Sequence, residues 1–475
     1  MTATTFPGWD VALRPAPGAP GPLRTDIAGF AGRAPRGPAG RALLVRDLAE
    51  FTRVYGAADG RANLCPAVAG YFRNGGDLAY VVRVLGPGAR PSRAVLPWEG
   101  GPAVTATSPG TWADDLRLTV TRRVVSGGRI SWSVEARPVR GPAELSRGTG
   151  LGEALAALTH VRVDPAGPAG TPVTAVLTGG ADGDPPGIED YRAALRPLLE
   201  QPEVAFLSLP DLWGDLGDAA VAFVAELAPQ VHATVDRLVL LDLPAAANAS
   251  TTAALTAIRA LDRAVPAPGS RAVAIYHPWI VAGGPDEQPG TAPAAIPASG
   301  HVAGLASRLD REAGPLRTPA NAPLVDVVDA AGDTVSRSAL VDNRVNPIRA
   351  LPGRGLQVWG GRTFDPAPQA RFVAHRRLVH RLVRAARRAA EPLVFEPDGP
   401  ELRLALTRAV TTVLLAAFRS GALLGRSPAE AFEVRTESGD GRAVCDVQFA
   451  PADPMEFIRI RLTLGAEGRL EVVER

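Results

Sequence analysis

The most informative stretch of the chain is residues 66–85, which read PAVAGYFRNGGDLAYVVRVL. Residues 66–73 predict a short helix, and the Asn-Gly-Gly at 74–76 ends it, because asparagine and glycine adopt the left-handed backbone that closes a helix. The apolar alternation at 79–85 predicts the strand that follows. The stretch therefore indicates a compact unit of strands and helices.

The residues upstream extend this unit. Residues 26–31 predict a buried strand. Asp47, with Glu50 three residues later, matches a capping box ahead of an apolar run, and Gly56 is placed to end that helix. Residues 1–22 are rich in proline and glycine and predict an extended N-terminal arm.

Downstream, the pattern of apolar residues changes twice. Short alternating runs between about 97 and 173 predict a β-rich segment. Beyond it, strand and helix patterns alternate, which favours a parallel α/β sheet. The predicted strands there are 173–178, 204–209, 237–243 and 271–276, and the predicted helices are 188–200, 219–227 and 251–265. After a Pro- and Gly-rich region with a helix at 301–312, the last third predicts helices at 371–390 and 400–418 and strands at 444–449, 457–464 and 470–473.

The length and composition limit the classes of protein to which the chain can belong. A chain of 475 residues that is 46% hydrophobic and 21% charged is large enough for more than one core. Its formal net charge of +2 demands neither nucleic acid nor an acidic membrane as a partner. The longest apolar run, residues 410–418, is far shorter than the roughly 20 residues that cross a bilayer. Residues 1–10 lack the pattern of a secretory signal, so we expect a cytoplasmic protein.

Two residue types exclude whole classes of site. All 51 basic residues are arginine, which excludes phosphate loops that end in lysine, Schiff-base enzymes and Ser-Lys hydrolases, since each needs an ammonium group. Cys65 and Cys445 are far apart in sequence, which favours neither a disulfide scaffold nor a zinc site. We expect no cofactor and no metal.

A catalytic alternative rests on Asp211 and Asp242, which follow two predicted parallel strands, where open α/β sheets place ligands. An α/β enzyme or ligand-binding protein with a site at these residues is therefore the alternative hypothesis. Acids at strand ends also begin turns and cap helices, and no Gly-rich dinucleotide fingerprint follows the first strand. His375 and His380 are five residues apart, which is not the spacing that places two metal ligands on one helix face.

The helix at 371–388 contains seven arginines and no acid, beside an approximate apolar stripe. This pattern predicts one buried face and one strongly positive face. Three interpretations stay open for the positive face: an acidic protein partner, a solvated or locally paired surface, or nucleic acid. The last would need interleaved aromatic residues or a basic domain, and the sequence has neither.

Motifs spread along the chain resemble the contractile tail sheath proteins of phages and of extracellular injection systems. The most recognisable is Tyr71-Phe72-Arg73-Asn74-Gly75-Gly76 before Tyr80-Val81-Val82-Arg83-Val84. The others follow in the family's order: Arg24 to Gly32 with Arg36-Gly37-Pro38, Ser108 to Trp112, Leu177 to Gly183, Tyr276 to Trp279, Pro297 to Gly304 with Asp310, Thr318 to Asn321, Val345 to Arg349, Gly353 to Gly355, Val358 to Thr363, Arg376 to Leu378 and Pro454 to Ile458. Phe6-Pro7-Gly8-Trp9 is a loose version of the family's arm motif, which leaves a main subunit or a minor paralogue open.

The resemblance implies a multidomain α/β fold and a domain plan. A discontinuous α+β core domain at 23–97 and 345–465 would hold a β-rich insert at 98–172 and an α/β domain at 173–344. Arms at 1–22 and 466–475 would flank it. The resemblance also implies a structural protein with no catalytic residue, assembled into a phage-tail-like particle.

The same resemblance implies the partners. Subunits would exchange terminal strands and stack as six-membered rings in a helical homo-oligomer around an inner tube protein, between baseplate and cap proteins, with no nucleic acid or membrane. We expect the arm contacts at Pro7, Gly8, Trp9, Val11, Leu13, Leu470, Val472 and Val473. We expect the tube contact on the arginine helix, at Arg377, Arg381, Arg384 and Arg388. Contraction would then drive the tube through a target envelope.

Overall fold

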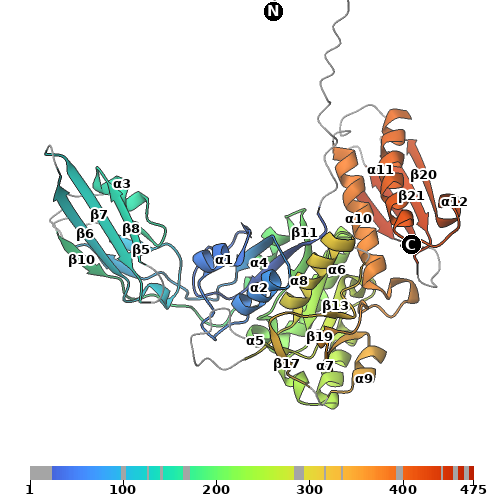
Figure 1. Cartoon of the computed structure of the whole chain (residues 1–475), viewed down its shortest axis with the longest axis horizontal. Helices are drawn as coiled ribbons and strands as arrows, with labels where there is room; N and C mark the ends of the chain where they lie inside the picture. Colours follow the sequence, from blue (N-terminus) through green and yellow to red (C-terminus); the bar gives the residue numbers. More distant parts are fainter. Residues whose placement is uncertain are drawn as a thin grey trace, which may run out of the picture.

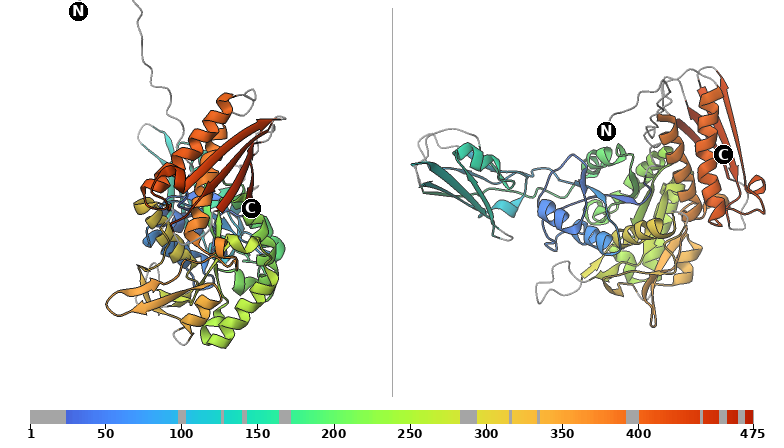
Figure 2. Two further views of the ribbon diagram at one scale, coloured as in Figure 1. Left: turned by 90° about the vertical axis from the view of Figure 1, so that its right-hand side faces the viewer. Right: turned by 45° about the horizontal axis from the view of Figure 1, so that its top comes forward.

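The computed structural model describes residues 24–97, 103–125, 128–139, 143–163, 172–282, 294–314, 317–332, 335–391, 400–439, 442–452, 458–464 and 470–474. Three parts follow one another across the molecule in Figure 1: a β-rich lobe (residues 91–178), a central body, and a C-terminal layer (residues 373–474). The lobe stands away from the body in Figure 1 and in the right-hand view of Figure 2. The predicted class, a mixed α/β multidomain protein, is confirmed.

The central body is built on a nine-stranded sheet of order β16-β19-β18-β13-β12-β11-β1-β3-β2. Neighbours from β18 to β3 pair in parallel, whereas β2, β19 and β16 join antiparallel at the two edges. The strands are β1 (Ile27–Gly32), β2 (Leu43–Val45), β3 (Ala79–Arg83), β11 (Val204–Ser208), β12 (Leu238–Asp242), β13 (Val273–His277), β16 (Ala322–Pro323), β18 (Val345–Leu351) and β19 (Gly355–Val358).

Helices cover both faces of this sheet, so β11, β12 and β13 are buried along their whole length. One face packs against α1 (Leu48–Tyr55), α2 (Leu64–Arg73) and α8 (Ser299–Ala313). The other packs against α4 (Ile188–Leu199), α6 (Ala219–Thr234) and α7 (Thr251–Ala264). The short helices α5 (Leu212–Leu216) and α9 (Arg337–Asp342) and a small sheet of β14 (Ile280–Ala282), β15 (Ala294–Ile296) and β17 (Val327–Ala330) complete the body.

The predicted helix signals near the N-terminal side of the body are confirmed. Asp47 caps α1 by accepting the backbone N–H of Glu50 at 2.6 Å. Gly56 ends α1 with a φ of 90°, a conformation that only glycine adopts without strain. The capping box itself is incomplete, because Glu50 accepts the N–H of Arg46 and not that of Asp47.

The backbones of helices α2 and α8 lie in direct contact, because α8 has glycine residues at the contact. A Cβ atom at Gly300 would lie 2.3 Å from the carbonyl oxygen of Ala67. One at Gly304 would lie 2.2 Å from that of Tyr71. The glycines of the 297–304 motif are therefore what allows α8 to pack closely on α2.

The β-rich lobe leaves the body after β3 and returns before α4. Its two sheets, β10-β6-β7-β8 and β4-β5-β9, enclose an apolar core of their own that includes Leu118, Val134 and Leu177. The elements are β4 (Arg93–Val95), β5 (Ala103–Ala106), β6 (Arg117–Val124), β7 (Ile130–Arg137), β8 (Glu144–Gly148), α3 (Leu151–Ala156), β9 (Val161–Val163) and β10 (Val173–Val176).

The C-terminal layer packs α10 (Val373–Ala390) and α11 (Pro400–Arg419) against a four-stranded antiparallel sheet (Figure 2, left). The sheet order is β20-β21-β22-β23, formed by β20 (Phe432–Gly439), β21 (Arg442–Phe449), β22 (Ile458–Leu464) and β23 (Leu470–Glu474), with α12 (Pro428–Ala431) before it. Leu382, Val410 and Val447 are in its core.

The sheet pairing crosses the predicted domain boundaries in several places, including the following two. Strand β10 pairs antiparallel with β6 of the lobe, whereas the boundary at 172/173 assigns it to the α/β domain. Strand β1, assigned to the core domain at 23–97, pairs in parallel with β11 of the segment 173–344. Both pairings join residues far apart in sequence, which local periodicity does not reveal.

Candidate functional site

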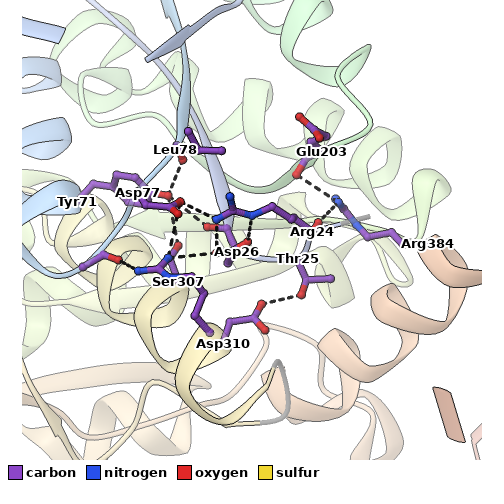
Figure 3. Close-up of polar contacts among 12 residues, drawn as sticks. Arg24, Thr25, Asp26, Tyr71, Asp77, Leu78, Glu203, Ser307, Asp310 and Arg384 are labelled. Atoms are coloured by element: carbon purple, nitrogen blue, oxygen red, sulfur yellow. Dashed lines mark hydrogen bonds and ion pairs between the residues drawn. The ribbon is translucent and has the colours of Figure 1, made fainter. Parts of the chain in front are cut away.

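A cluster of polar contacts surrounds the root of the N-terminal arm, which we define as residues 24–26 (Figure 3). The Arg24 guanidinium pairs with the carboxylates of Asp26 and Asp77, at 2.6 Å in each case. Arg311 from α8 pairs with the same two carboxylates, at 3.1 and 3.8 Å. Burial raises the pKa of Asp26, but its hydrogen bonds and charge contacts with Arg24 and Arg311 outweigh burial, so the pKa lies below its usual range.

The backbone of the arm root is held by α10 and α8. Arg384 donates to the carbonyl oxygen of Arg24 at 2.5 Å, and Arg377 donates to that of Thr25 at 2.8 Å. The Thr25 hydroxyl donates to the Asp310 carboxylate at 2.7 Å. The first residues after the predicted arm are therefore fixed to two helices as well as to the sheet.

Arg384 is fully buried, and each of its three guanidinium nitrogens donates a hydrogen bond. Besides Arg24 it donates to the carbonyl oxygens of Glu203, Val204 and Asp236 at 2.6–3.2 Å. Burial lowers its pKa to about 10, so the side chain stays charged at neutral pH. The hydrogen-bond acceptors of this buried cation are backbone carbonyl groups. Through them, one side chain joins the arm root, the start of β11 and the segment before β12.

Arg377 is the second buried arginine of this cluster. It forms an ion pair with Asp310 of α8, and its guanidinium carbon lies 4.6 Å from the centre of the Phe206 ring. Burial lowers its pKa, and Asp310 opposes that shift. A pair of this kind holds its partners in one arrangement, because breaking it would leave a buried charge uncompensated.

Tyr71, from the most recognisable sequence motif, completes the arm root. Its hydroxyl donates to the Leu78 carbonyl oxygen at 2.6 Å and lies 3.2 Å from that of Asp26. The ring is fully buried and contacts Phe30 edge-on. The motif therefore positions the turn before β3 and the arm root together. These contacts attach residues 24–26 mechanically to the sheet and to two helices.

The two strand-end acids of the catalytic alternative are buried and hold backbone N–H groups. Asp211 accepts from Arg33 at 2.8 Å and from Asn63, just before α2, at 2.5 Å. Burial raises its pKa to about 6, against those hydrogen bonds. Asp242 accepts from Ala298 at 2.7 Å and from Ser299 at 3.0 Å, at the start of α8.

Burial likewise raises the pKa of Asp242, to about 7, and the bonds from Ser299 and Ala298 oppose that rise. Perturbed carboxyls mark active sites in many enzymes, but here each faces the start of a helix, where an acid is stabilising. These contacts give both acids a structural role, and nothing in the geometry favours the catalytic alternative. Among the described residues no group of three or more His, Cys, Asp or Glu could hold a metal ion.

The predicted arm residues fall in two places. Pro7, Gly8, Trp9, Val11 and Leu13 lie outside the described residues. Leu470, Val472 and Val473 lie in β23, which pairs antiparallel with β22 of the same chain, Val472 opposite Leu462. Strand β23 ends the sheet order, so in the described chain only one of its edges is paired.

The chain matches no protein-family model and no curated protein. Solved structures do match it over nearly its whole length. The sheath tail protein of Desulfitobacterium hafniense is 13% identical with a TM-score of 0.63, and the match covers 96% of this chain and 100% of that one. The sheath tail protein of Listeria innocua is 12% identical with a TM-score of 0.67, over 94% and 96% of the two chains. The helical sheath of the anti-feeding prophage in its contracted state is 21% identical with a TM-score of 0.56, over 96% and 98%.

This chain has the tail sheath fold. The resemblance seen in the sequence motifs is thereby confirmed for the fold, and two of those motifs, 71–76 and 297–304, meet where α2 packs against α8. No helix in the described part of the chain is long and apolar enough to cross a membrane.

Within the sheath fold, the positive face predicted for the arginine helix is mostly internal. Arg377 and Arg384 are buried in the chain's own contacts, whereas the predicted contact with an inner tube needs side chains that a partner can reach. Arg381 and Arg388 are half-buried, and Arg388 pairs with Glu391. The sequence pattern failed here because it treats arginine as an exposed residue, whereas carbonyl partners from distant segments bury it.

Sequence reasoning missed the arm root as a site. Arg24, Asp26 and Asp77 carry no recognisable spacing, since Asp77 is 53 residues from Arg24. Only the motif matches at 24–32 and 71–76 drew attention to this region. A polar cluster assembled from three separate segments gives no local sequence signal.

Proposed function

We propose that this chain is the structural subunit of a contractile sheath, which polymerises helically around an inner tube and shortens to drive that tube through a target envelope. The observation that supports this most strongly is the sheath fold over 94% or more of the chain. One matching structure is itself a helical sheath in the contracted state, and others come from baseplate structures of the same anti-feeding prophage.

Strand exchange through the terminal arms would link the subunits. Strand β23 has an unpaired edge in the described chain, and an extended segment such as Phe6 to Leu13 of a neighbour would satisfy such an edge. In the polymer β23 would leave β22 and pair with another copy. A head-to-tail contact of this type does not close on itself and generates a helical polymer, here a stack of six-membered rings between baseplate and cap.

The arm root would connect such a link to the body. A force applied to residues 1–22 would be transmitted to the body through Arg24 and Thr25. Their carbonyl groups accept hydrogen bonds from Arg384 and Arg377. The force would then act on α10, α8 and the central sheet together. Subunits could in this way rotate as rigid bodies while the arms act as hinges.

Contraction in this account needs no fuel. The extended lattice would be kinetically trapped, and rotation of the subunits would reach a lattice with more buried contact. We retain the tube contact as a proposal for Arg381 and Arg388, the half-buried arginines of the predicted set. The particle would assemble in the cytoplasm.

Deletion of each arm tests the proposal. Sedimentation velocity should find high-mass polymers for the full chain, and monomers for chains that lack 1–22 or 466–475, with circular dichroism confirming that both shortened chains are folded. The substitution Arg129→Gln, in an exposed position of the lobe, is the control and should polymerise normally. Polymerisation of both shortened chains as efficient as that of the full chain would refute arm exchange.

A further inference from the structure

A cleft of about 510 Å³ lies where the β-rich lobe meets the central body. The body contributes Arg36 and Arg41 from the segment between β1 and β2, and Arg53 from α1. The lobe contributes Trp112, His160 and Arg162 among others. Four arginines therefore line the cleft, and none of its lining residues, all in the described part of the chain, is Asp or Glu.

Arg36 is the innermost of these arginines. Its guanidinium donates to the carbonyl oxygen of Arg53 at 2.9 Å and lies 5.5 Å from the centre of the Trp112 ring. No carboxylate forms an ion pair with it among the described residues, and its Nε is buried without a hydrogen-bond partner. Burial lowers the pKa of Arg36, and the charge of Glu144 behind the cleft partly offsets this. The cation is thus partly desolvated and incompletely neutralised.

His160 links Arg36 to Glu144. The His160 Nδ1 lies 2.7 Å from the Glu144 carboxylate, and its Nε2 lies 3.0 Å from Nη1 of Arg36. Since Arg36 only donates, Nε2 must accept, and Nδ1 then donates to Glu144. In this tautomer the neutral His160 ring accepts a hydrogen bond from Arg36 and holds it in place. The positive charge of the Arg36 guanidinium therefore stays at the wall of the cleft.

The outer arginines add charge without neutralising partners inside the cleft. Arg41 and Arg162 are exposed and form no ion pair with any described carboxylate. Arg53 is exposed as well and reaches Glu50 only at 3.7 Å. Several guanidinium groups around one space repel one another unless an anion lies between them.

We propose that this cleft binds a small anion with two or more phosphate groups. Guanidinium groups match phosphate oxygens with paired hydrogen bonds, and several of them converging on one site favour a multiply charged anion over a single carboxylate. The volume is in the range of small-molecule sites. Because the lining residues come from both sides of the joint, the bound anion would fix the lobe to the body.

The site joins parts that few other polar contacts connect. Buried Arg83 donates to the Pro109 carbonyl oxygen at 2.8 Å, and the Gly37 N–H donates to the Ser108 hydroxyl at 3.1 Å. Both contacts lie beside the cleft. An anion bridging Arg36 and Arg162 would add a further connection to these two and to the hydrogen bond between Arg36 and His160. This inference does not depend on the proposed sheath assembly.

Calorimetric titration of the full chain with inorganic pyrophosphate tests the inference, at constant ionic strength and in parallel with adenosine diphosphate. We expect saturable binding of pyrophosphate that weakens at least about ten-fold in Arg162→Gln and in Arg41→Gln, because each removes a charged donor. Both residues are exposed, so the variants should fold, and circular dichroism checks this. Arg129→Gln, outside the cleft, is the matched control and should bind as the unaltered chain does.

The two ligands separate the possible sources of phosphate. Tighter binding of adenosine diphosphate than of pyrophosphate would assign the cleft to nucleotides, and equal or weaker binding would assign it to phosphate chains alone. Absence of saturable binding of either ligand up to about 10 mM, on the order of the weakest affinities of interest, would overturn the inference. So would equal binding by Arg162→Gln, Arg41→Gln and the control.

Discussion

Arginine has opposite environments in the C-terminal layer and at the lobe joint. On α10, Arg377 and Arg384 are buried and bonded to carbonyl and carboxylate oxygens of their own chain. At the joint, Arg41 and Arg162 border a cleft without any carboxylate in its wall. The first arrangement is complete and holds segments of the chain together. The second has unused donors and positive charge, so it suits a ligand. The partners of an arginine, and not its position in an amphipathic pattern, decide which role it has.

The largest expected effect is the loss of Arg384. Arg384→Leu would remove the donors for carbonyl oxygens of Arg24, Glu203, Val204 and Asp236, and the contacts to Val204 and Asp236 are fully buried. We expect a loss of about 3–5 kcal/mol of unfolding free energy. Urea titration followed by circular dichroism measures it, at a single protein concentration because assembly shifts apparent stability.

Arg388→Gln on the same helix is the control for this experiment. Arg388 is half-buried, and its ion pair within the described residues is with the exposed Glu391, so its loss should cost no more than about 0.5 kcal/mol. A loss of the same size in both variants would contradict the distinction between internal and peripheral arginines of α10.

The next largest effect should come from the Arg377–Asp310 pair. Arg377→Leu or Asp310→Leu alone would leave a buried charge without its partner, and we expect each to cost about 3 kcal/mol. The double variant should cost clearly less than the sum of the two, because neither charge then remains. A double-mutant cycle in urea measures this coupling. Strict additivity would show that the pair does not hold α8 to α10.

A smaller effect concerns the pH dependence due to Asp242. Burial raises its pKa to about 7 in the folded chain. The folded state therefore binds a proton that the unfolded state has already lost, and the corresponding stability, present below the unfolded pKa of about 4, disappears as pH rises to about 7. Asp242→Asn keeps an oxygen for Ala298 and Ser299 and cannot titrate.

Thermal midpoints between pH 5 and 8 test this prediction. The unaltered chain should lose stability relative to Asp242→Asn between pH 5 and 7, by at most about 1.4 kcal/mol per pH unit, and the difference should then level off. Parallel curves for the two chains would show that Asp242 is ionised in the folded state throughout this range.

The smallest effect is expected at the lobe joint. Arg41→Gln and Arg162→Gln should change the stability of the unliganded chain by less than about 0.5 kcal/mol, or raise it slightly, because each relieves repulsion between like charges. The measurement is the same urea titration. A loss of more than about 1 kcal/mol would show that these arginines have structural partners and would remove the contrast with α10.

The local elements were largely predictable from the sequence. Helix α1 follows from the Asp47 cap and the Gly56 stop, and the predicted helix at 371–390 corresponds to α10 at Val373–Ala390. Periodicity and caps depend on neighbours within a few residues, so one sequence reveals them. The parallel pairing of β11, β12 and β13 agrees with the parallel α/β sheet predicted from their alternation with helices.

Long-range contacts were not predictable from local patterns. The pairing of β1 with β11 and the burial of Arg384 depend on residues as many as 360 positions away in the chain. An arginine-rich helix predicts an exposed face because burial of a guanidinium is costly without partners. The carbonyl groups that offset that cost belong to segments whose approach the sequence does not encode locally.

Negative-stain electron microscopy tests the central claim most directly. The full chain would be expressed alone and together with the proteins encoded beside it, and the particles imaged. The sheath account predicts hollow, transversely striated cylinders in at least one preparation, which chains lacking 1–22 should not form. Only small, discrete particles in both preparations would contradict the account.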